Sequence, residues 1–427
     1  MSFFKLEKHG TSFKQEVVAG FTTFSTMAYI LFVNPHILSQ TGMDSGSILF
    51  ATIITSSIAT LVMGLLANYP FALAPGMGLN AYFTYGIVLS AGYSWQQGLG
   101  ACFWAGIIFL VLNLLGIRKK IMNAIPSCIR IATVGGLGFF LAFIGLRNSG
   151  IVVPDPVTTV ALGNLHTFDV LMTLLGIILI AVLMIKKVNS AILITAIFTW
   201  LIGLFTGHAH WQGIFSMPPD PSPTLFQFDL ISTLKPEFWP IIMSFVFIAI
   251  FDTAGSLIGL AEQAKLLNPE GRLPRANRAL AADAIGTVIG GCTGTSPVTT
   301  YMESASGIAT GGRTGLTSVV VGILFLASLF FAPLVQSIPL YATTPALLIV
   351  GALMIREIRR IDWDDLSEGL PAFLVIVTIP LTFSIATGIA FGFLLYPIIK
   401  LLAGRGSEVP PLIWVIAFLF SLKFIWA

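Results

Sequence analysis

Long apolar runs separated by short polar segments cover most of the chain. They lie at about 17–38, 46–66, 97–116, 121–147, 168–185 and 189–206, and then at 238–260, 277–293, 314–335, 342–356, 371–383, 386–402 and 411–426. About 20 apolar residues are enough for a helix to cross the hydrocarbon core of a membrane. The pattern therefore predicts an all-α polytopic membrane protein.

Two further segments, at 76–88 and 299–310, are too short and too polar for ordinary spanning helices. At about 1.5 Å per residue, each would reach only about halfway across a 30 Å core. The residues just before them, Phe71–Pro75 and Thr293–Pro297, would be extended at membrane depth. Extended backbone is tolerated there only where it is buried in protein or lines a cavity. We therefore expect two half-helices, each preceded by a short strand, with the two strands paired.

The two short segments occupy matching positions of an internal repeat. A shift of about 223 residues places 17–38 on 240–261, Asn80 on Glu303 and 189–206 on 412–427. If 371–402 forms one bent span, each half has seven spans, and an odd number requires that the second half be inverted. The prediction is fourteen transmembrane segments in two inverted seven-span repeats. Such repeats, with interrupted segments at matching positions, indicate a transporter with its site near the membrane midplane.

The charge pattern orients the chain. Only 10% of the residues are charged, against about 25% in soluble domains. Lysine and arginine gather in loops that the positive-inside rule places in the cytoplasm with the N-terminus, at 117–130, 186–187, 261–278, 311–313 and 356–365. The loops left outside, including the proline-rich linker at 207–236, contain one lysine, Lys235, and no arginine. The rule disagrees with the repeat at one place, because a single span at 371–402 would put Lys400 and Arg405 outside.

Three polar residues lie where apolar ones are expected. Asp252 is in the middle of an apolar run, Glu303 is in the second short segment, and Asn80 is in the first. A charge at the bilayer centre costs roughly 2.5–3.5 kcal/mol, so an intramembrane acid indicates a functional site. Two carboxylates held close together in such a place favour binding of a proton by one of them. This suggests proton symport, with Glu303 or Asp252 as the proton carrier.

The same residues suggest a ligand. Carboxylates accept hydrogen bonds and an asparagine both donates and accepts, which suits a small, flat, neutral molecule rich in N–H groups. Aromatic residues near them in sequence could stack on such a molecule, namely Phe24, Tyr82, Phe251 and Tyr301. The alternatives are that the aromatic residues pack in the core or against lipid and that the acids only join helices. Asp283 and Glu262 are expected nearer the cytoplasm, solvated or paired with arginine.

Other signals are weaker. The three cysteines lie in apolar segments at unrelated spacings, and His208 and His210 are in a loop. No metal site or cofactor is predicted from them. The run Gly135-Gly136-Leu137-Gly138 is typical of a close contact between helices.

Three stretches resemble a known family: Ala74–Phe83, Phe251–Ser256 and Ser296–Ser304. They are similar to the signature stretches of the azaguanine-type purine permeases, which are nucleobase–cation symporters with the uracil permease fold. The resemblance covers nearly the whole chain. Uracil permeases have a histidine one turn after the acid of the eighth helix, where this chain has Ser256, which favours the purine branch.

The resemblance implies a core domain formed by 17–116 (spans 1–4) and 237–335 (spans 8–11). It also implies a gate domain that rocks against the core, formed by 120–206 (spans 5–7) and 340–427 (spans 12–14), and a homodimer. By the same resemblance Glu303 and Asp252 match acidic substrate contacts and Asn80 matches a polar one. The predicted substrate site also includes Thr26, Phe24, Phe251, Met302, Ser304 and Gly78.

The predicted function is secondary active import of hypoxanthine, guanine, adenine or a related purine with H⁺ across the cytoplasmic membrane. The protein is expected to be surrounded by lipid, to have a cytoplasmic N-terminus and to bind no nucleic acid. The sequence leaves open which purine is preferred and whether H⁺ or Na⁺ is coupled. One alternative is an anion transporter of the sulfate or bicarbonate type with the same fold, which two acids in the site disfavour. An intramembrane enzyme is not expected, because no histidine at membrane depth accompanies the acids.

Overall fold

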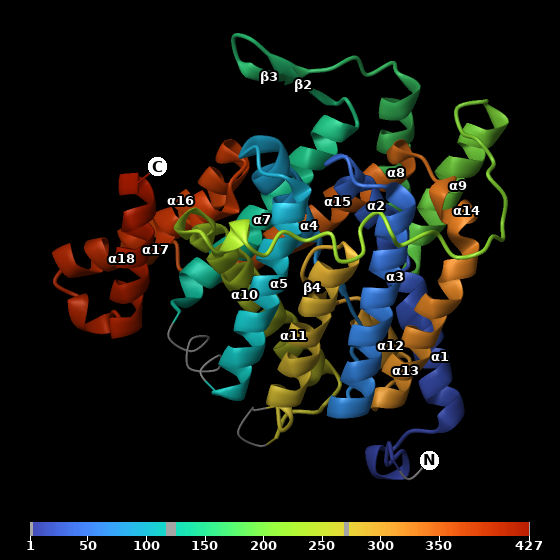
Figure 1. Ribbon diagram of the computed structural model, residues 1–427, viewed down its shortest axis with the longest axis horizontal. Helices are drawn as coiled ribbons and strands as arrows, with labels where there is room; N and C mark the ends of the chain where they lie inside the picture. Colours follow the sequence, from blue (N-terminus) through green and yellow to red (C-terminus); the bar gives the residue numbers. More distant parts are fainter. Residues whose placement is uncertain (1–2, 117–124, 269–272, 427) are drawn as a thin grey trace.

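The computed structural model describes residues 3–116, 125–268 and 273–426. Almost all of the regular structure is helical (Figure 1). Nine helical segments in this part of the chain are long and apolar enough to cross a membrane, and the shorter α9 (Ala191–Phe205) and α16 (Leu366–Thr382) are apolar as well. The predicted all-α polytopic fold is confirmed.

The elements form two successive series, one in each half of the chain. Those of the first half are α1 (Phe13–Met27) with α2 (Ile30–Ser39), α3 (Ser45–Val62) with η2 (Met63–Ala67), β1 (Leu73–Pro75) with α4 (Met77–Ala81) and the π-helical η3 (Tyr82–Ser90), α5 (Trp95–Leu114), α7 (Ser127–Asn148), α8 (Phe168–Ile185) and α9. A hairpin of β2 (Val152–Asp155) and β3 (Thr159–Leu162) joins α7 to α8.

The second half repeats this order. Its elements are α10 (Trp239–Gln263), α11 (Ala276–Thr293), β4 (Val298–Thr300) with α12 (Ser304–Ala309), α13 (Gly315–Ser328) with η6 (Leu329–Phe331) and α14 (Ala332–Gln336), α15 (Leu340–Ile355) with η7 (Arg356–Arg360), α16 and α17 (Ile385–Leu402). A further helix, α18 (Pro411–Trp426), follows the fourteenth span. Short 3₁₀ turns lie in the connections at Glu7–His9, Ser232–Leu234, Pro236–Phe238 and Gly406–Glu408.

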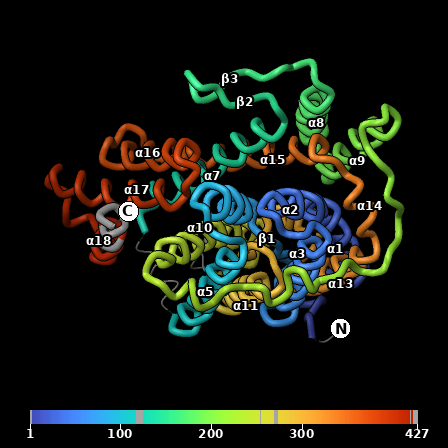
Figure 2. Tube along the Cα trace, turned by 45° about the horizontal axis from the view of Figure 1, so that its top comes forward, coloured from blue at the N-terminus to red at the C-terminus, as the bar shows by residue number. Residues whose placement is uncertain are grey.

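The helices pack in two groups. In the first, α3 contacts α2, α11 and α13, while α5 contacts α10 and α11, and α1 contacts α12 and α13. In the second, α7 packs against α15, α16 and α17, and α15 packs against α8 and α9. Figure 2 shows α15, α16 and α17 beside α7, on one side of the first group. Each group therefore combines elements from both halves of the chain, as an inverted repeat requires.

Small residues allow α7 and α15 to cross closely. A Cβ atom at Gly138 would lie 2.6 Å from the carbonyl oxygen of Gly351, and one at Gly351 would lie 2.5 Å from the carbonyl oxygen of Gly138. Neither position can carry a side chain without moving the other helix. The contact predicted from the run Gly135-Gly136-Leu137-Gly138 is confirmed.

A buried carboxylate joins α1 to α13. Glu16, which is fully buried, accepts hydrogen bonds from the backbone N–H groups of Arg313, Thr314 and Thr317 and from the Thr317 hydroxyl at 2.6 Å. The first N–H groups of a helix have no partner within the helix, so a carboxylate there supplies an N-cap from another element. The contact also places the 311–313 loop at the same end of the bundle as the N-terminal segment.

The C-terminal region differs from the prediction. Residues 371–402 do not form one bent span, because α16 ends before Phe383, which has the left-handed φ of 49°, and α17 runs back along α16. The fourteenth span is therefore α17, and 411–426 forms the additional α18. The helical hairpin returns Lys400 and Arg405 to the end of the bundle that carries the 356–365 loop. The charge pattern was correct at this place, and the repeat argument was wrong.

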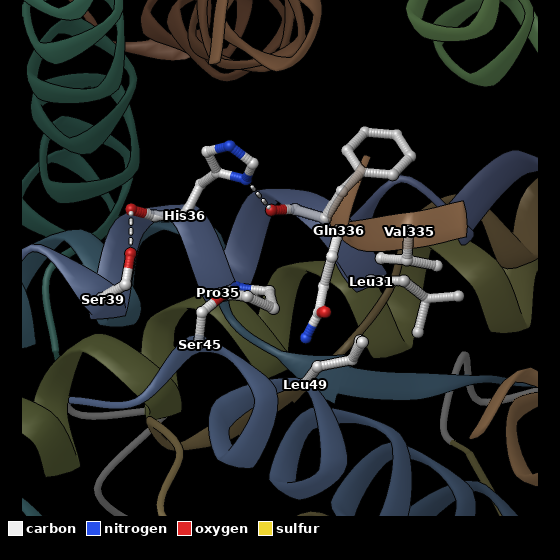
Figure 3. Close-up of a pocket in the computed structure, with 9 residues that line it drawn as sticks. Leu31, Pro35, His36, Ser39, Ser45, Leu49, Val335 and Gln336 are labelled. Atoms are coloured by element: carbon white, nitrogen blue, oxygen red, sulfur yellow. Dashed lines mark hydrogen bonds between the residues drawn. The ribbon is translucent and has the colours of Figure 1, made fainter. Parts of the chain in front are cut away.

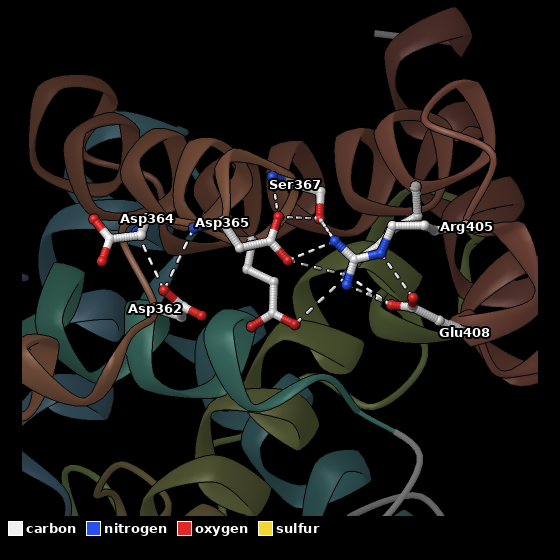
Figure 4. Close-up of polar contacts among 8 residues, drawn as sticks. Asp362, Asp364, Asp365, Ser367, Arg405 and Glu408 are labelled. Carbon is white, nitrogen blue, oxygen red and sulfur yellow. Dashed lines mark hydrogen bonds and ion pairs between the residues drawn. The ribbon is translucent and has the colours of Figure 1, made fainter.

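Ion pairs join the 356–365 loop to the 403–410 loop, which connects α17 to α18 (Figure 4). Arg405 contacts Asp365 at 2.7 Å and Glu408 at 2.7 Å, and the fully buried Lys400 lies 2.9 Å from Glu408 and 3.6 Å from Glu368. Hydrogen bonds from Arg405 and Lys400 lower the pKa of Glu408 to about 2. Hydrogen bonds from Ser367 and Arg405 lower the pKa of Asp365. Both carboxylates therefore stay ionised at neutral pH.

We expect that cysteines introduced singly at Asp364 and Ser407 will react with a membrane-impermeant maleimide from the same side as one at Lys8. The reason is that the Arg405–Asp365 contact places both loops at one end of the bundle. A cysteine at Asn164, in the connection that follows β3 at the other end of α7, is the opposite-side control. Labelling of the cysteine at position 407 from the same side as the cysteine at position 164 would contradict the hairpin of α16 and α17. The background protein carries alanine in place of the native Cys102, Cys128 and Cys292.

Candidate functional site

The two broken segments meet as a short antiparallel strand pair. Leu73 pairs with Thr300, Ala74 with Thr299 and Pro75 with Val298, and all six residues are buried. The predicted pairing is confirmed. The second strand lies later than expected, at 298–300 and not at 293–297, and α12 has only six residues. The helical segment after β1 is longer than α12, because α4 continues into η3, which ends at Ser90.

Side chains satisfy the backbone around this crossing. Thr60 of α3 donates to the carbonyl of Leu73 and accepts from its N–H, at 3.0 and 2.9 Å. The Tyr301 hydroxyl donates to the carbonyl of Pro75 at 2.6 Å, and Ser304 accepts from the N–H of Ala72 at 2.9 Å. Unpaired backbone groups are costly away from water, so these contacts are what permits extended chain here.

The strand register allows more than one correspondence between the two halves. A two-fold axis through Ala74 and Thr299 gives a shift of 299 − 74 = 225 residues, and one through Pro75 and Val298 gives 298 − 75 = 223. The shift of 223, which places Asn80 on Glu303, is therefore compatible with the register and stays a prediction.

Glu303 lies where the first span is interrupted. It directly precedes α12, and the Tyr29 hydroxyl donates to its carboxylate at 2.5 Å. Tyr29 is buried and lies in the break between α1 and α2. Thr26, at the end of α1, donates to the main-chain carbonyl of Glu303 at 3.3 Å. The break in span 1 and the start of α12 thus hold each other through this acid.

Asp252 lies at the same level on α10, and the Thr299 side chain of β4 hydrogen-bonds to its carboxylate. Both Glu303 and Asp283 are near enough to act on Asp252 electrostatically. Asp283, on α11, is fully buried and accepts from Thr253 at 3.1 Å. The expectation that Asp283 is solvated is wrong. Its position among the small residues of an otherwise apolar helix is the signal that could have placed it in this acidic cluster.

Asn80 is fully buried in the first turn of α4. Its amide nitrogen donates to Asn34 of α2 at 3.0 Å. Asn34 in turn donates to Thr52 of α3 and to Thr295 in the segment before β4, at 2.7 and 2.8 Å. Asn34 escaped the sequence prediction because it sits between apolar residues at a helix position that a packing asparagine could equally fill.

The remaining predicted site residues are placed differently. Phe24 contacts Phe325 edge-on at 5.4 Å between ring centres, and Phe251 stacks on Phe247. Their partners are therefore core aromatic residues. Ser304 uses its hydroxyl on the strand backbone. Met302 is 52% exposed, and Gly78 faces Leu137 of α7 so closely that a Cβ atom would lie 3.0 Å from that side chain.

A small pocket lies elsewhere, between α2, the start of α3 and α14 (Figure 3). Its lining includes His36, Leu49 and Gln336, and none of the acids. Within the residues that the structure describes, no three His, Cys, Asp or Glu side chains are grouped to hold a metal ion. We call Asp252, Asp283 and Glu303 the acidic cluster.

Comparison with known proteins identifies the chain. A model described as "Permease family" matches residues 14–391. The chain belongs to this permease family. A putative permease of Methanocaldococcus jannaschii is 55% identical to it over 99% of this chain and 98% of the relative. The adenine permease AdeQ of Escherichia coli K12 is 44% identical over 99% and 95% of the two chains.

A guanine/hypoxanthine permease of Bacillus subtilis, PbuO, is also 44% identical to this permease, over 98% of this chain and 99% of the relative. The predicted resemblance to purine permeases is confirmed, and these relatives are transporters and not enzymes.

Solved structures share the fold of the permease. The transmembrane domain of the cyanobacterial bicarbonate transporter BicA aligns with a TM-score of 0.66 at 15% identity, over 88% of this chain and 96% of that one. The murine anion transporter Slc26a9 aligns with a TM-score of 0.62 at 11% identity, over 89% and 68%. At such identities the likeness concerns the fold alone.

We expect Thr60→Val to lower the thermal stability of the detergent-solubilised permease. The substitution removes both hydrogen bonds that Thr60 makes to Leu73 and leaves two buried backbone groups without that partner, at about 1–3 kcal/mol each. Thr60→Ser keeps the hydroxyl and is the matched control. Equal melting temperatures for the valine and serine variants would show that Thr60 does not support the strand crossing.

Proposed function

We propose that this permease imports purine nucleobases together with protons across the cytoplasmic membrane, as a multi-pass protein with a cytoplasmic N-terminus. Relatives named as adenine permeases and as guanine/hypoxanthine permeases are about equally similar to it, which supports purines as the substrate class. The observation that carries the proposal is the half-buried acid Glu303, held by Tyr29 beside the strand crossing and close to Asp252.

The chemistry of the site suits a purine. Ionised carboxylates only accept hydrogen bonds, so Glu303 and Asp252 would bind a ligand through its N–H groups. Purine bases are flat and carry such groups along their edges. Burying charge without compensation is costly, and an N–H-rich neutral ligand supplies that compensation without adding charge. Glu303 and Asp252 are the proposed substrate contacts, with Asn80 and Thr26 beside them.

Proton coupling follows from the crowding of acids. Asp283 is fully buried, while Asp252 and Glu303 are half-buried. The charges of Asp283 and Glu303 both act on Asp252, and like charges that little water screens repel each other. Uptake of one proton relieves this repulsion, and binding of a base can be linked to that uptake. We assign the transported proton to Glu303 or Asp252.

The movement is a rocking of one helix group against the other. The first group, with residues 17–116 and 237–335, would be the core domain, and the second, with 120–206 and 340–427, the gate domain, joined through the linker at 207–236. The acids and both strands belong to the first group, so the site would move as a unit. The contact of Gly78 with Leu137 lies at the boundary between the groups. Surrounding lipid and a second copy of the chain, in a homodimer, would hold the gate domain.

The anion alternative is weaker. It rests on the fold shared with the bicarbonate transporter BicA and with Slc26a9. The acids Asp252, Asp283 and Glu303 would repel an anion at the strand crossing, where this fold brings both halves together.

We expect Glu303→Gln to abolish concentrative uptake of labelled hypoxanthine, guanine and adenine in cells without purine permeases of their own. Gln keeps an oxygen for the Tyr29 hydroxyl, so the protein should fold, but it cannot exchange a proton. Glu262→Gln, at an exposed position near the end of α10, is the control and should transport normally. Protonophore-sensitive accumulation by Glu303→Gln at the wild-type level would refute the assignment of the site.

Tyr29→Phe should lower the rate of purine uptake about tenfold, because a hydrogen bond to a charged group contributes roughly 1.5–3 kcal/mol. Phenylalanine fills the same buried volume, so the melting temperature should change little. Tyr85→Phe removes a buried hydroxyl that accepts from Asn148 and is the matched control. Unchanged uptake in Tyr29→Phe would mean that this donor does not serve Glu303 during transport.

A further inference from the structure

A chain of directed hydrogen bonds ends at Asn80. It begins at the backbone carbonyl of Ile48, which can only accept, and which receives the Thr52 hydroxyl hydrogen at 2.7 Å. Thr52 has only one hydrogen to give, so its oxygen must accept from Asn34, 2.7 Å away. The group of Asn34 that faces Thr52 is therefore its NH₂. Its second N–H is used on Thr295, at 2.8 Å.

The orientation of the Asn34 amide also determines that of the Asn80 amide. Since the nitrogen of Asn34 is committed to two threonines, its oxygen is the atom that faces Asn80, and it accepts from the Asn80 nitrogen at 3.0 Å. Turning the Asn34 amide over would set its oxygen against a Thr52 oxygen whose hydrogen is held by Ile48. The Asn80 amide is thereby oriented with its oxygen away from Asn34.

That oxygen is fully buried and has no hydrogen-bond partner among the residues that the structure describes. A buried acceptor left unpaired costs about 1–3 kcal/mol, and an unpartnered buried polar atom in a folded protein calls for an explanation. Asn80 lies five residues beyond the strand β1, on the segment that crosses β4. The unused atom is an acceptor, like the oxygens of Glu303 and Asp252.

We propose that Asn34, Thr52 and Thr295 are positioning residues that lock the Asn80 amide with its oxygen available to an N–H group of the substrate. The inference rests on the proposed purine transport and adds a specificity determinant to it. A base that has lost the matching N–H group leaves the Asn80 oxygen unpaired and is rejected. With the relay broken, the Asn80 amide can turn over, and it then offers either its oxygen or its NH₂ group.

The test uses cells that express the full-length permease and the purine that it accumulates. Competition by each N-methyl derivative of that purine measures the loss of one N–H group at a time. In the wild type, at least one derivative should compete about tenfold less well than the parent base, as expected for one hydrogen bond. In Thr52→Val combined with Thr295→Val, this ratio should fall to about threefold or less. Thr52→Ser combined with Thr295→Ser should restore the wild-type ratio.

Ser56→Ala is a matched control, because the buried hydroxyl of Ser56 in α3 donates to the backbone carbonyl of Thr52 in its own helix. In this variant the ratio of competition between parent base and N-methyl derivative should equal that of the wild type. If the double valine variant is not recovered in the membrane, the single Thr52→Val and Thr295→Val variants serve, with intermediate ratios expected. Weaker competition by parent and derivatives alike, with the ratio unchanged, would overturn the relay. Equal competition by all derivatives in the wild type would overturn it too. Absence of purine uptake by the wild type would instead refute the proposed function.

Discussion

The pairing of β1 with β4 is the constraint on which the rest of the structure depends. Extended chain in the middle of a membrane protein leaves backbone groups that lipid cannot satisfy. Three residues from each half pair their backbones with one another. The side chains of Thr60, Tyr301 and Ser304 form hydrogen bonds with further backbone groups of the crossing. Because the two strands come from opposite halves, the crossing also brings α4 and α12 to one place. The acidic cluster exists only where this crossing holds its parts together.

Hydroxyl groups compensate the acids of that cluster. The hydroxyl of Tyr29 hydrogen-bonds to Glu303, that of Thr299 to Asp252 and that of Thr253 to Asp283. A hydroxyl can donate to a carboxylate and rotate to accept when the carboxylate is protonated. Such partners suit acids whose charge changes during a cycle, whereas a lysine or arginine would favour one charge state. The ion pairs of Arg405 with Asp365 and Glu408 lie far along the chain, at one end of the bundle.

Much of this could be predicted from the sequence. The interrupted segments, their strands and the pairing of those strands followed from length and from the cost of unsatisfied backbone, and those rules left few alternatives. The position of β4 did not follow, because Pro297 was taken as the end of the extended stretch when Val298 and Thr300 continue it. The burial of Asp283 and the role of Asn34 in the hydrogen-bond chain were not predicted, for another reason. Whether a polar residue on an apolar helix meets lipid, solvent or another polar group depends on neighbours from distant parts of the chain. At the C-terminus the local charges of Lys400 and Arg405 were a better guide than the distant repeat, since α18 has no place in that repeat.

The polar groups of the crossing are distributed unequally between the two halves. Asp252, Asp283 and Glu303 all come from the second half, while Asn34 and Asn80 come from the first. Ionisable groups are thus on one copy of the repeat and oriented amides on the other. Under the proposed function the base would touch both copies while the proton would be carried by one, so the two halves could not exchange roles during the transport cycle.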